Sequence, residues 1–278
     1  MAVTDGPAPV RVTVAQVVVA QDREVNRRTA RDALDEASRA RADLLVLPEY
    51  ASGYDPRGVG PAHAEPLDGP YVTLLRESAG STGIAVIAGV TLPGSAAAGP
   101  PARAVNALVA VDAAGELAGV YRKVHLYDAF GYRESDHLEP GPPDAEPVTL
   151  RVGDLTFGVL TCYDLRFPEA SRRVVDAGAD VLVYPAAWVA GPLKADHWRT
   201  LLLARAIENT AAVVGVGMTG PGVTGRSLVA GPDGVVALEL GEEETYRTAD
   251  LDPARVAEVR RANPSLANRR YAVTPARG

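Results

Sequence analysis

Cys162, the one cysteine in the sequence, stands where a thiol could serve as a nucleophile. It follows the apolar segment 157–161, and Pro168 shortly after it can open a helix. A thiolate at such a junction would be stabilised by the positive end of that helix. The Tyr163 backbone N–H would point towards an oxyanion formed on the group that the sulfur attacks. A buried structural cysteine is the alternative, because free cysteine is among the most buried residue types.

A carboxylate and an ammonium group follow two other predicted strands. Glu49 comes after the apolar run Leu44–Leu47, just past the C-terminal end of a predicted strand. Functional sites of α/β sheets are commonly found at such strand ends. Lys123 follows the strand predicted over 117–121, and the long loop after it contains Glu134. By itself Glu49 would be unremarkable, and Lys123 would be a solvated surface charge. A joint role requires a fold that brings these strand ends together.

Other motifs do not support a competing chemistry. Residues 215–220, Gly-Val-Gly-Met-Thr-Gly, match the dinucleotide-binding fingerprint and follow a predicted strand. Residues 221–225, Pro-Gly-Val-Thr-Gly, cannot start the helix that would hold a pyrophosphate, so we predict a loop there. The Gly-x-Ser-x-Gly turn of serine hydrolases is absent. The histidines lack the spacing of metal ligands, so we predict no metal site and no cofactor. They are His63, His125, His137 and His197.

Strands and helices alternate along the chain. The helix predicted over 22–41 has apolar residues at three- and four-residue steps among many charges, which is an amphipathic pattern. Short apolar runs such as 44–47 are typical of strands that are covered on both faces. The other predicted helices are 70–79, 168–177, 195–209 and one that begins at Asp252. The other predicted strands are 10–20, 84–91, 104–111, 117–121, 148–152, 155–161, 181–185, 211–217, a hairpin that turns on 231–234, and 245–251.

Two segments of the chain resemble each other. Residues 42–48, Ala-Asp-Leu-Leu-Val-Leu-Pro, are echoed by residues 179–185, Ala-Asp-Val-Leu-Val-Tyr-Pro, and the hairpins at Gly115 and Gly234 also correspond. This indicates an internal duplication; chance similarity between two buried strands is the alternative. Two halves with helices on one side of each sheet can bury both sheets by packing face to face. We therefore predict an α/β fold, a four-layer αββα sandwich of two mixed β-sheets with helices on the outer faces.

Composition bounds the class of protein. The 278 residues are 47% hydrophobic and 23% charged, as in a globular chain, and the net charge of −7 is unfavourable for binding nucleic acid or anionic lipid. No apolar stretch approaches the about 20 residues of a membrane span, and one cysteine suggests no dependence on an oxidising compartment. We expect a cytoplasmic protein without nucleic-acid or membrane partners.

No linker divides the chain, so we predict one domain over residues 10–262. Residues 1–9 contain an acid and two prolines where a signal peptide would be basic and apolar, and they are predicted to be a flexible tail. Residues 263–278 are polar and are predicted to be a C-terminal arm. Such an arm could lie on a neighbouring subunit or form a disordered tail.

Three strand-end segments together resemble the nitrilase superfamily of carbon-nitrogen hydrolases. They are Leu-Pro-Glu49, Tyr-Arg-Lys123-Val-His-Leu-Tyr, and Thr-Cys162-Tyr-Asp-Leu-Arg-Phe-Pro-Glu. The likeness extends from Val10 to about Leu251. It implies the αββα sandwich, a homodimer or larger homo-oligomer, and a catalytic set of Glu49, Lys123 and Cys162. Glu134 matches a second glutamate found in many members.

The resemblance also implies a mechanism. Cys162, its pKa lowered by Lys123 and the helix end, would attack an amide carbonyl and form a thioester. Glu49 would take the thiol proton, pass a proton to the leaving ammonia and activate the water that hydrolyses the thioester. Lys123 and the Tyr163 N–H would hold the oxyanion, and Glu134 would orient Lys123.

The sequence around the cysteine looks like the omega-amidase and deaminated glutathione amidase group, whose substrates are amides that bear a carboxylate. Arg166 is the candidate to bind that carboxylate; a structural ion pair with Asp164 or Glu169 is the alternative. The resemblance also suggests aromatic residues that line the pocket, although core packing explains them nearly as well. They are Tyr54, Tyr127 and Trp188.

Other assignments stay open. An N-carbamoyl amino acid hydrolase or an aliphatic amidase is the runner-up, and a catalytically silent binding protein of this fold is less favoured. A nitrilase proper usually has Trp-Glu after the cysteine, where this chain has Tyr163-Asp164. Arg226 and Thr210 differ from the residues common in relatives, which puts recognition of the far end of the substrate in doubt.

Overall fold

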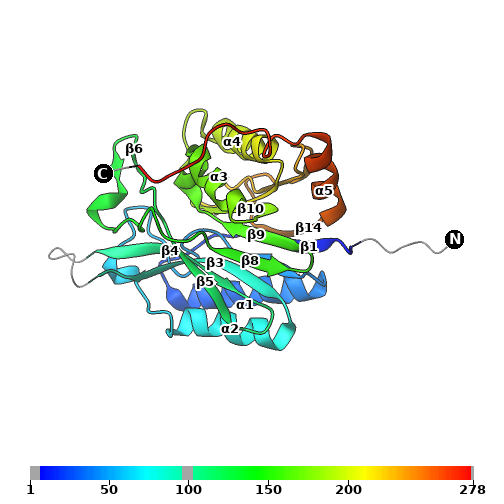
Figure 1. Cartoon of the computed structure of the whole chain (residues 1–278). Coiled ribbons are helices and arrows are strands. Elements are labelled where there is room, and N and C mark those ends of the chain that lie inside the picture. The colour runs from blue at the N-terminus through cyan, green and yellow to red at the C-terminus, as the bar shows by residue number, and fades with distance from the viewer. Residues whose placement is uncertain (1–6, 96–102, 277–278) are drawn as a thin grey trace.

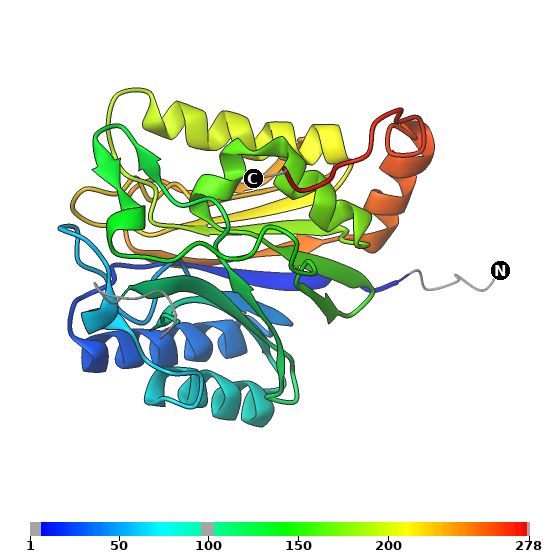
Figure 2. The same cartoon turned by 60° about the vertical axis from the view of Figure 1, so that its left-hand side comes forward.

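Two β-sheets lie face to face at the centre of the molecule, with helices outside each sheet (Figure 1). The computed structural model describes residues 7–95 and 103–276. The predicted four-layer αββα sandwich is confirmed, and Figure 2 shows the same layers from a second direction. Most of the predicted N-terminal tail, residues 1–6, lies outside the described residues, and residues 7–9 are exposed and without regular structure.

The first sheet has the strand order β14-β1-β2-β3-β4-β5. Strands β1, β2 and β3 run parallel, and β4 and β5 form an antiparallel hairpin at one edge. Helices α1 and α2 cover its outer face. The bounds are β1 Val10–Gln16, α1 Arg23–Arg39, β2 Leu44–Val46, α2 Pro70–Thr82, β3 Ala85–Pro93, β4 Ala104–Val111, β5 Leu117–Arg122 and β14 Thr245–Leu251.

The second sheet repeats this arrangement with the order β13-β12-β11-β10-β9-β8. Strands β9, β10 and β11 are parallel, β12 and β13 form the edge hairpin, and α3 and α4 cover the outer face. The bounds are β8 Thr149–Val152, β9 Leu155–Val159, α3 Pro168–Asp176, β10 Val181–Ala186, α4 Lys194–Asn209, β11 Ala212–Gly217, β12 Leu228–Ala230 and β13 Val236–Glu239.

The strand order therefore agrees with the predicted duplication. Each half has three parallel strands joined by two helices and then an antiparallel hairpin. Two strands extend this pattern: β8 pairs with β9, and β14 returns from the second half to pair with β1. Helix α5, Pro253–Ala262, follows β14 and places Val256 against the residues between the sheets.

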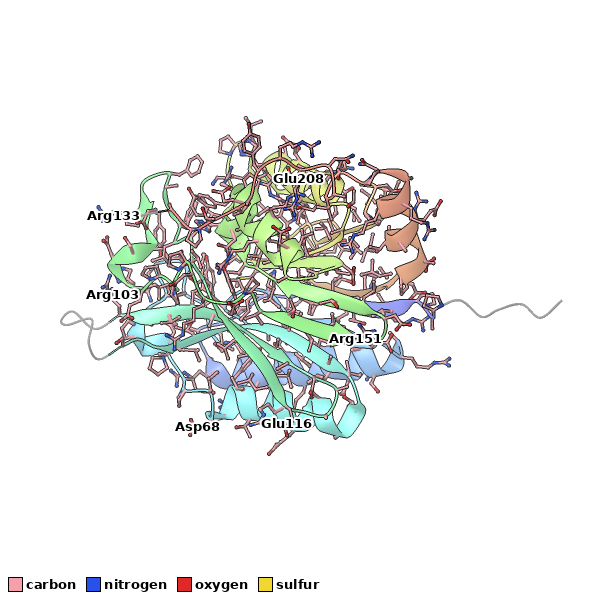
Figure 3. The ribbon with its side chains drawn as sticks, viewed as in Figure 1. Asp68, Arg103, Glu116, Arg133, Arg151 and Glu208 are labelled. Atoms are coloured by element: carbon pink, nitrogen blue, oxygen red, sulfur yellow. The ribbon has the colours of Figure 1, made fainter. Side chains whose placement is uncertain are left out.

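Apolar side chains from the inner faces of both sheets fill the space between them. Val12, Val14 and Leu44 of the first sheet meet Phe157 and Val183 of the second, and all five are fully buried. Charged side chains such as Asp68, Glu116 and Arg151 project from the outside instead (Figure 3). Burial of this continuous apolar layer holds the two sheets together, so the strand ends of both halves stay in fixed relative positions.

Local sequence signals account for the element ends. Asp22 is the N-cap of α1, where its carboxylate accepts hydrogen bonds from the amides of Glu24 and Val25. The strand predicted over 10–20 ends earlier, at Gln16, and beyond it Val18 forms an isolated bridge with Thr219. The glycine-rich segment after β11 is a loop, as predicted.

Short elements connect the larger ones. They are η1 Pro61–His63, the hairpin of β6 Asp128–Ala129 and β7 Tyr132–Arg133, η3 Glu134–Asp136, and η4 Cys162–Arg166. Among residues 7–95 and 103–276, no helix is long and apolar enough to cross a membrane.

The segment after α5 lies along α3 of its own chain. Arg269 forms an ion pair with Asp176 at 2.6 Å, and residues 273–276 line a surface cavity together with Arg173. The segment runs as the red trace above the second sheet in Figure 1. The described part of the predicted C-terminal arm is thus folded against α3.

Candidate active site

The strand-end residues identified from the sequence meet in one cavity of about 630 Å³. Glu49 follows β2, Lys123 follows β5 and Cys162 begins η4, so three elements from the two sheets converge. All three residues are buried. The cavity is lined by all nine predicted site residues, namely Glu49, Tyr54, Lys123, Tyr127, Glu134, Cys162, Tyr163, Arg166 and Trp188.

Glu49 is held by three donors. Lys123 Nζ donates to Oε1 at 2.9 Å, Asn106 Nδ2 donates to the same oxygen at 2.7 Å, and the Ala187 N–H donates to Oε2 at 2.7 Å. Because Ala187 follows β10, the last bond joins the two sheets at the site. Gly89 on β3 makes room for this segment, since a Cβ there would lie 2.5 Å from the Glu49 Cα.

Lys123 lies between two carboxylates. Its Nζ is 2.9 Å from Glu49 Oε1 and 2.9 Å from Glu134 Oε2. Burial alone would lower the pKa of this ammonium group, but the charges of Glu134 and Glu49 outweigh burial and raise the pKa well above its ordinary value. Lys123 is therefore charged throughout the neutral range and supplies a fixed positive charge inside the protein.

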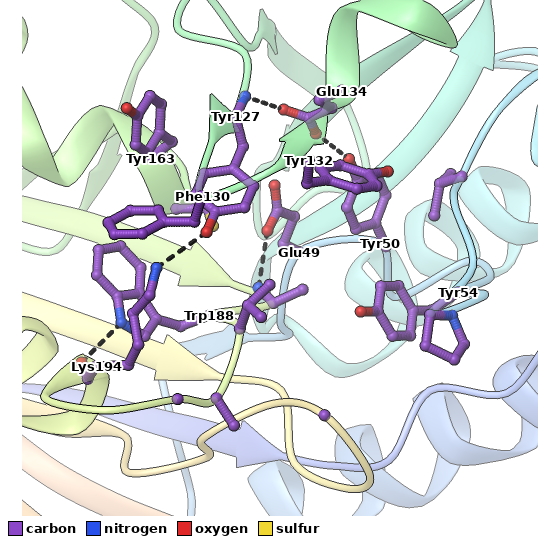
Figure 4. Close-up of a pocket in the computed structure, with 18 of the residues that line it drawn as sticks. Glu49, Tyr50, Tyr54, Tyr127, Phe130, Tyr132, Glu134, Tyr163, Trp188 and Lys194 are labelled. Atoms are coloured by element: carbon purple, nitrogen blue, oxygen red, sulfur yellow. Dashed lines mark hydrogen bonds between the residues drawn. The ribbon is translucent and has the colours of Figure 1, made fainter.

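Glu134 is fixed by neutral donors as well as by Lys123. The Tyr127 N–H donates to Oε2 at 2.6 Å, and the Tyr50 hydroxyl and Asn106 amide donate to Oε1, as Figure 4 shows in part. Burial alone would raise the pKa of Glu134, but Lys123 and these hydrogen bonds outweigh it and lower the pKa. Glu134 is thus an ionised, immobile counter-charge to Lys123.

Cys162 occupies a strained turn. Its φ of +46° lies in the left-handed region, which is uncommon for residues other than glycine and consistent with the predicted sharp strand-to-helix turn. The Tyr163 N–H lies in the first turn of η4, where N–H groups have no partner within the helix. Helix α3 begins six residues after the cysteine, at Pro168.

The expected low pKa of Cys162 is wrong. Burial raises the pKa of the thiol well above its ordinary value, and the charge of Glu49 adds to the rise. The charge of Lys123 acts in the expected direction but is outweighed. The cysteine is therefore a neutral thiol beside a carboxylate, and a proton must leave it as it becomes a nucleophile.

Asp164 connects the cysteine segment with the lysine segment. It is fully buried and accepts hydrogen bonds from Tyr121 Oη at 2.8 Å and from the Thr161 N–H at 3.0 Å. His125 Nδ1 lies 2.8 Å from its other carboxylate oxygen. Because Lys123 lies between Tyr121 and His125 in sequence, these bonds fix its backbone relative to Cys162.

Arg166 does not form either ion pair considered from the sequence. Its Nη2 lies 3.4 Å from His197 Nδ1, and its guanidinium carbon lies 4.9 Å from the centre of the Trp188 ring. Within the described residues, no carboxylate is within ion-pair distance, and the buried Nε has no hydrogen-bond partner. The guanidinium group is thus available to an anion in the cavity.

Sequence reasoning missed Lys194, the first residue of α4. Its Nζ donates to Tyr127 Oη at 2.9 Å and lies 3.6 Å from the centre of the Phe130 ring, as seen in Figure 4. Nothing in its sequence context distinguishes it from a surface lysine. Asn106 was also missed, although a lone amide within the apolar strand 104–111 was a usable signal.

The two departures from relatives lie elsewhere. Arg226 pairs with Glu242 at 2.7 Å on the surface, and Thr210 caps α4. Neither lines the cavity, so the expectation that they bear on recognition of the substrate's far end is not supported. The three predicted aromatic residues, Tyr54, Tyr127 and Trp188, all line the cavity. Trp188 is buried, and Tyr54 lies on the opposite side of the cavity (Figure 4).

A four-layer αββα sandwich whose cavity holds Glu, Lys and Cys at its strand ends defines the nitrilase superfamily. Comparison with known proteins agrees: the chain belongs to the carbon-nitrogen hydrolase family, whose model matches residues 11–261. It is 36% identical over 263 residues to the deaminated glutathione amidase of Escherichia coli O157:H7, covering 94% of this chain and 97% of that protein.

Two further similarities bear on the site. The chain is 35% identical over 230 residues to the 2-oxoglutaramate amidase of Bacillus subtilis, covering 80% of this chain and 83% of that protein. A solved amidase from Nesterenkonia sp. AN1 has a TM-score of 0.75 at 29% identity, covering 96% of this chain and 99% of the other. That structure, a glutamate-to-glutamine mutant, carries the acetamide moiety of fluoroacetamide on its active-site cysteine.

Proposed function

We propose that this protein hydrolyses small amides that bear a carboxylate, giving the acid and ammonia through a thioester on Cys162. The observation that carries the substrate class is Arg166, a guanidinium group that lines the same cavity as Cys162 and has no carboxylate partner among the described residues. Arg166 is half-buried, its buried Nε has no hydrogen-bond partner among the described residues, and such a charge is stabilised when an anion pairs with it. A substrate carboxylate supplies that anion. The matched relatives named for deaminated glutathione and 2-oxoglutaramate support this class.

The reaction begins with the neutral thiol. Glu49 accepts the thiol proton while the sulfur bonds to the amide carbon, and the carbonyl π electrons move to oxygen. Lys123 and the Tyr163 N–H stabilise the resulting oxyanion. Collapse of the tetrahedral adduct breaks the carbon–nitrogen bond as Glu49 returns the proton to the leaving ammonia, and a thioester remains.

Hydrolysis repeats these steps with water. Glu49 accepts a proton from water while the water oxygen attacks the thioester carbon, and collapse expels the sulfur, which regains the proton from Glu49. The buried hydrogen bonds from Lys123, Asn106 and the Ala187 N–H keep the carboxylate in one position for both half-reactions. We propose Glu134 as a positioning residue that holds Lys123.

Ammonia release from a substrate panel tests the proposal. The panel contains 2-oxoglutaramate, deaminated glutathione, simple aliphatic amides, N-carbamoyl amino acids and a nitrile, each with wild type and Cys162→Ala. Deaminated glutathione is a secondary amide whose hydrolysis releases no ammonia, so its turnover is followed by release of its amine product instead. Turnover of the carboxylate-bearing amides that Cys162→Ala abolishes is the expected result. A preference for N-carbamoyl amino acids or aliphatic amides would instead establish the alternative amidases, and silence on every substrate would favour a binding protein.

A further inference from the structure

Two cations lie side by side in the cavity without a carboxylate between them. Lys194 Nζ and the Arg166 guanidinium both lie over the ring of Phe130, at 3.6 Å and 5.8 Å from its centre, and both lie over the ring of Trp188, at 6.0 Å and 4.9 Å. The negative potential of the ring faces partly stabilises the two positive charges. Figure 4 shows the Lys194 ammonium group between these rings, on the side of the cavity away from Tyr54.

Several features make this an unfavourable place for the ammonium group of a lysine. Lys194 is only 8% exposed and is the first residue of a 16-residue helix, whose positive end disfavours a cation. Burial, followed by the charge of Arg166, lowers the pKa of its ammonium group. Its hydrogen-bond acceptor is the neutral Tyr127 hydroxyl. An element that breaks several local preferences at once indicates a functional constraint.

The carboxylates that line the cavity are engaged elsewhere. Glu49 and Glu134 both bind Lys123, and Asp55 forms an ion pair with Arg57 at 2.7 Å. The Lys194 end of the cavity therefore has a net positive potential. It attracts a carboxylate and repels an ammonium group on the neighbouring carbon.

We propose that Lys194 is a specificity-determining residue that favours 2-oxo acid amides over the corresponding 2-amino acid amides. The proposal rests on the proposed function, because it places the substrate carboxylate near Arg166 while the amide reaches Cys162. A 2-oxo carboxylate presents a single negative charge and a carbonyl acceptor to Lys194. A 2-amino carboxylate presents an ammonium group at the same position, where two cations repel it.

Backbone contacts fix where this ammonium group stands. The Lys194 carbonyl accepts a hydrogen bond from Trp188 Nε1 at 2.8 Å, and the Lys194 N–H donates to the Gly191 carbonyl at 3.1 Å. The lysine and the ring that holds Arg166 therefore belong to one rigid unit. Such a unit can discriminate between substituents without a large movement.

Three substrates of equal length test the proposal: 2-oxoglutaramate, glutamine and glutaramate, which has no substituent at that carbon. In Lys194→Met we expect the ratio of kcat/KM for 2-oxoglutaramate to that for glutamine to fall about tenfold or more, the equivalent of one charge–charge interaction. The kcat/KM for glutaramate should fall less than the kcat/KM for 2-oxoglutaramate. Lys194→Arg should retain most of the wild-type ratio. Equal losses on all three substrates would overturn the proposal.

Tyr127→Phe separates charge from positioning. It removes the hydroxyl that Lys194 binds and keeps both the ring and the N–H that binds Glu134. If the ratio falls as far in Tyr127→Phe as in Lys194→Met, the lysine acts through Tyr127 and the proposal fails. The expected result is a ratio near that of wild type.

A binding measurement distinguishes failure of this inference from failure of the proposed function. Calorimetry with 2-oxoglutarate and with glutamate, using Cys162→Ala with and without Lys194→Met, requires no turnover. We expect the Lys194 change to weaken binding of 2-oxoglutarate about tenfold more than binding of glutamate. Wild type that hydrolyses none of the amides would refute the proposed function. Equal changes in binding of the two acids would refute the role of Lys194.

Discussion

His125 Nδ1 lies 2.8 Å from Asp164 Oδ1, and this contact links the segment after β5 to the segment after β9. The ring of His125 also stacks on Phe167 with centres 3.8 Å apart. Lys123 and Cys162 each lie two residues before one partner of the contact. The distance between the proposed oxyanion donor and the proposed nucleophile therefore depends on a buried carboxylate that does not line the cavity.

Asp164→Asn tests this positioning role. The amide keeps the shape of the side chain but presents an NH₂ group to neighbours that are donors, so we expect kcat to fall about tenfold to a hundredfold with a smaller change in KM. Asp180→Asn is the matched control, since Asp180 is ion-paired with Arg260 away from the cavity. If both variants lose the same thermal stability and Asp164→Asn keeps its kcat, Asp164 is purely structural.

The raised pKa of Cys162 predicts how the thiol reacts with iodoacetamide. The thiolate is the reactive form, and a raised pKa moves its formation to higher pH. The rate of inactivation should rise with pH and show no plateau below about pH 9. Glu49→Gln removes the charge that ranks after burial as the cause, so its curve should shift to lower pH. A plateau near neutrality in wild type would show that the thiol has a low pKa after all.

Glu134→Gln should lower kcat by about tenfold to a hundredfold and leave KM nearly unchanged. The reason is that Glu134 acts through Lys123, which it neutralises and orients. It accepts its hydrogen bonds from Lys123, Asn106, Tyr50 and the Tyr127 N–H. Glu116→Gln, at an exposed site, is the control. Full activity in Glu134→Gln would remove Glu134 from the mechanism.

Arg166→Met should act on binding of the carboxylate. Loss of a charged hydrogen-bond donor predicts a KM for 2-oxoglutaramate that is about tenfold to a hundredfold higher, whereas turnover of a simple aliphatic amide should not change. Arg173→Met is the control, because Arg173 lies on α3 and binds the carbonyls of Pro143 and Ala145. A parallel loss on both amides would mean that Arg166 maintains the cavity and does not select the substrate.

The fold was accessible from the sequence because two buried strands resemble each other and occupy equivalent places. Residues 42–48 contain β2, residues 179–185 contain most of β10, and each is the central parallel strand of its half. The return of β14 to the first sheet was not predicted. The partly exposed residues of β14 show that the strand lies at a surface, but they do not identify the strand with which it pairs.

The candidate site was accessible where residue type and strand end coincide, as at Glu49, Lys123 and Cys162. Lys194 was missed because its role arises from burial and from the rings of Tyr127 and Phe130, which are distant in sequence. The direction of the Cys162 pKa was missed for a similar reason. A sequence shows that a lysine and a carboxylate accompany the thiol, but the balance between their charges and burial exists only in the folded cavity.

The most direct test of the account is to trap the thioester. Wild-type protein turning over 2-oxoglutaramate is quenched in acid and its intact mass is measured, followed by mapping of the modified peptide. The account predicts an added acyl group on Cys162, and in Cys162→Ala neither the adduct nor ammonia release. Ammonia release that persists in Cys162→Ala would contradict a mechanism built on this thiol.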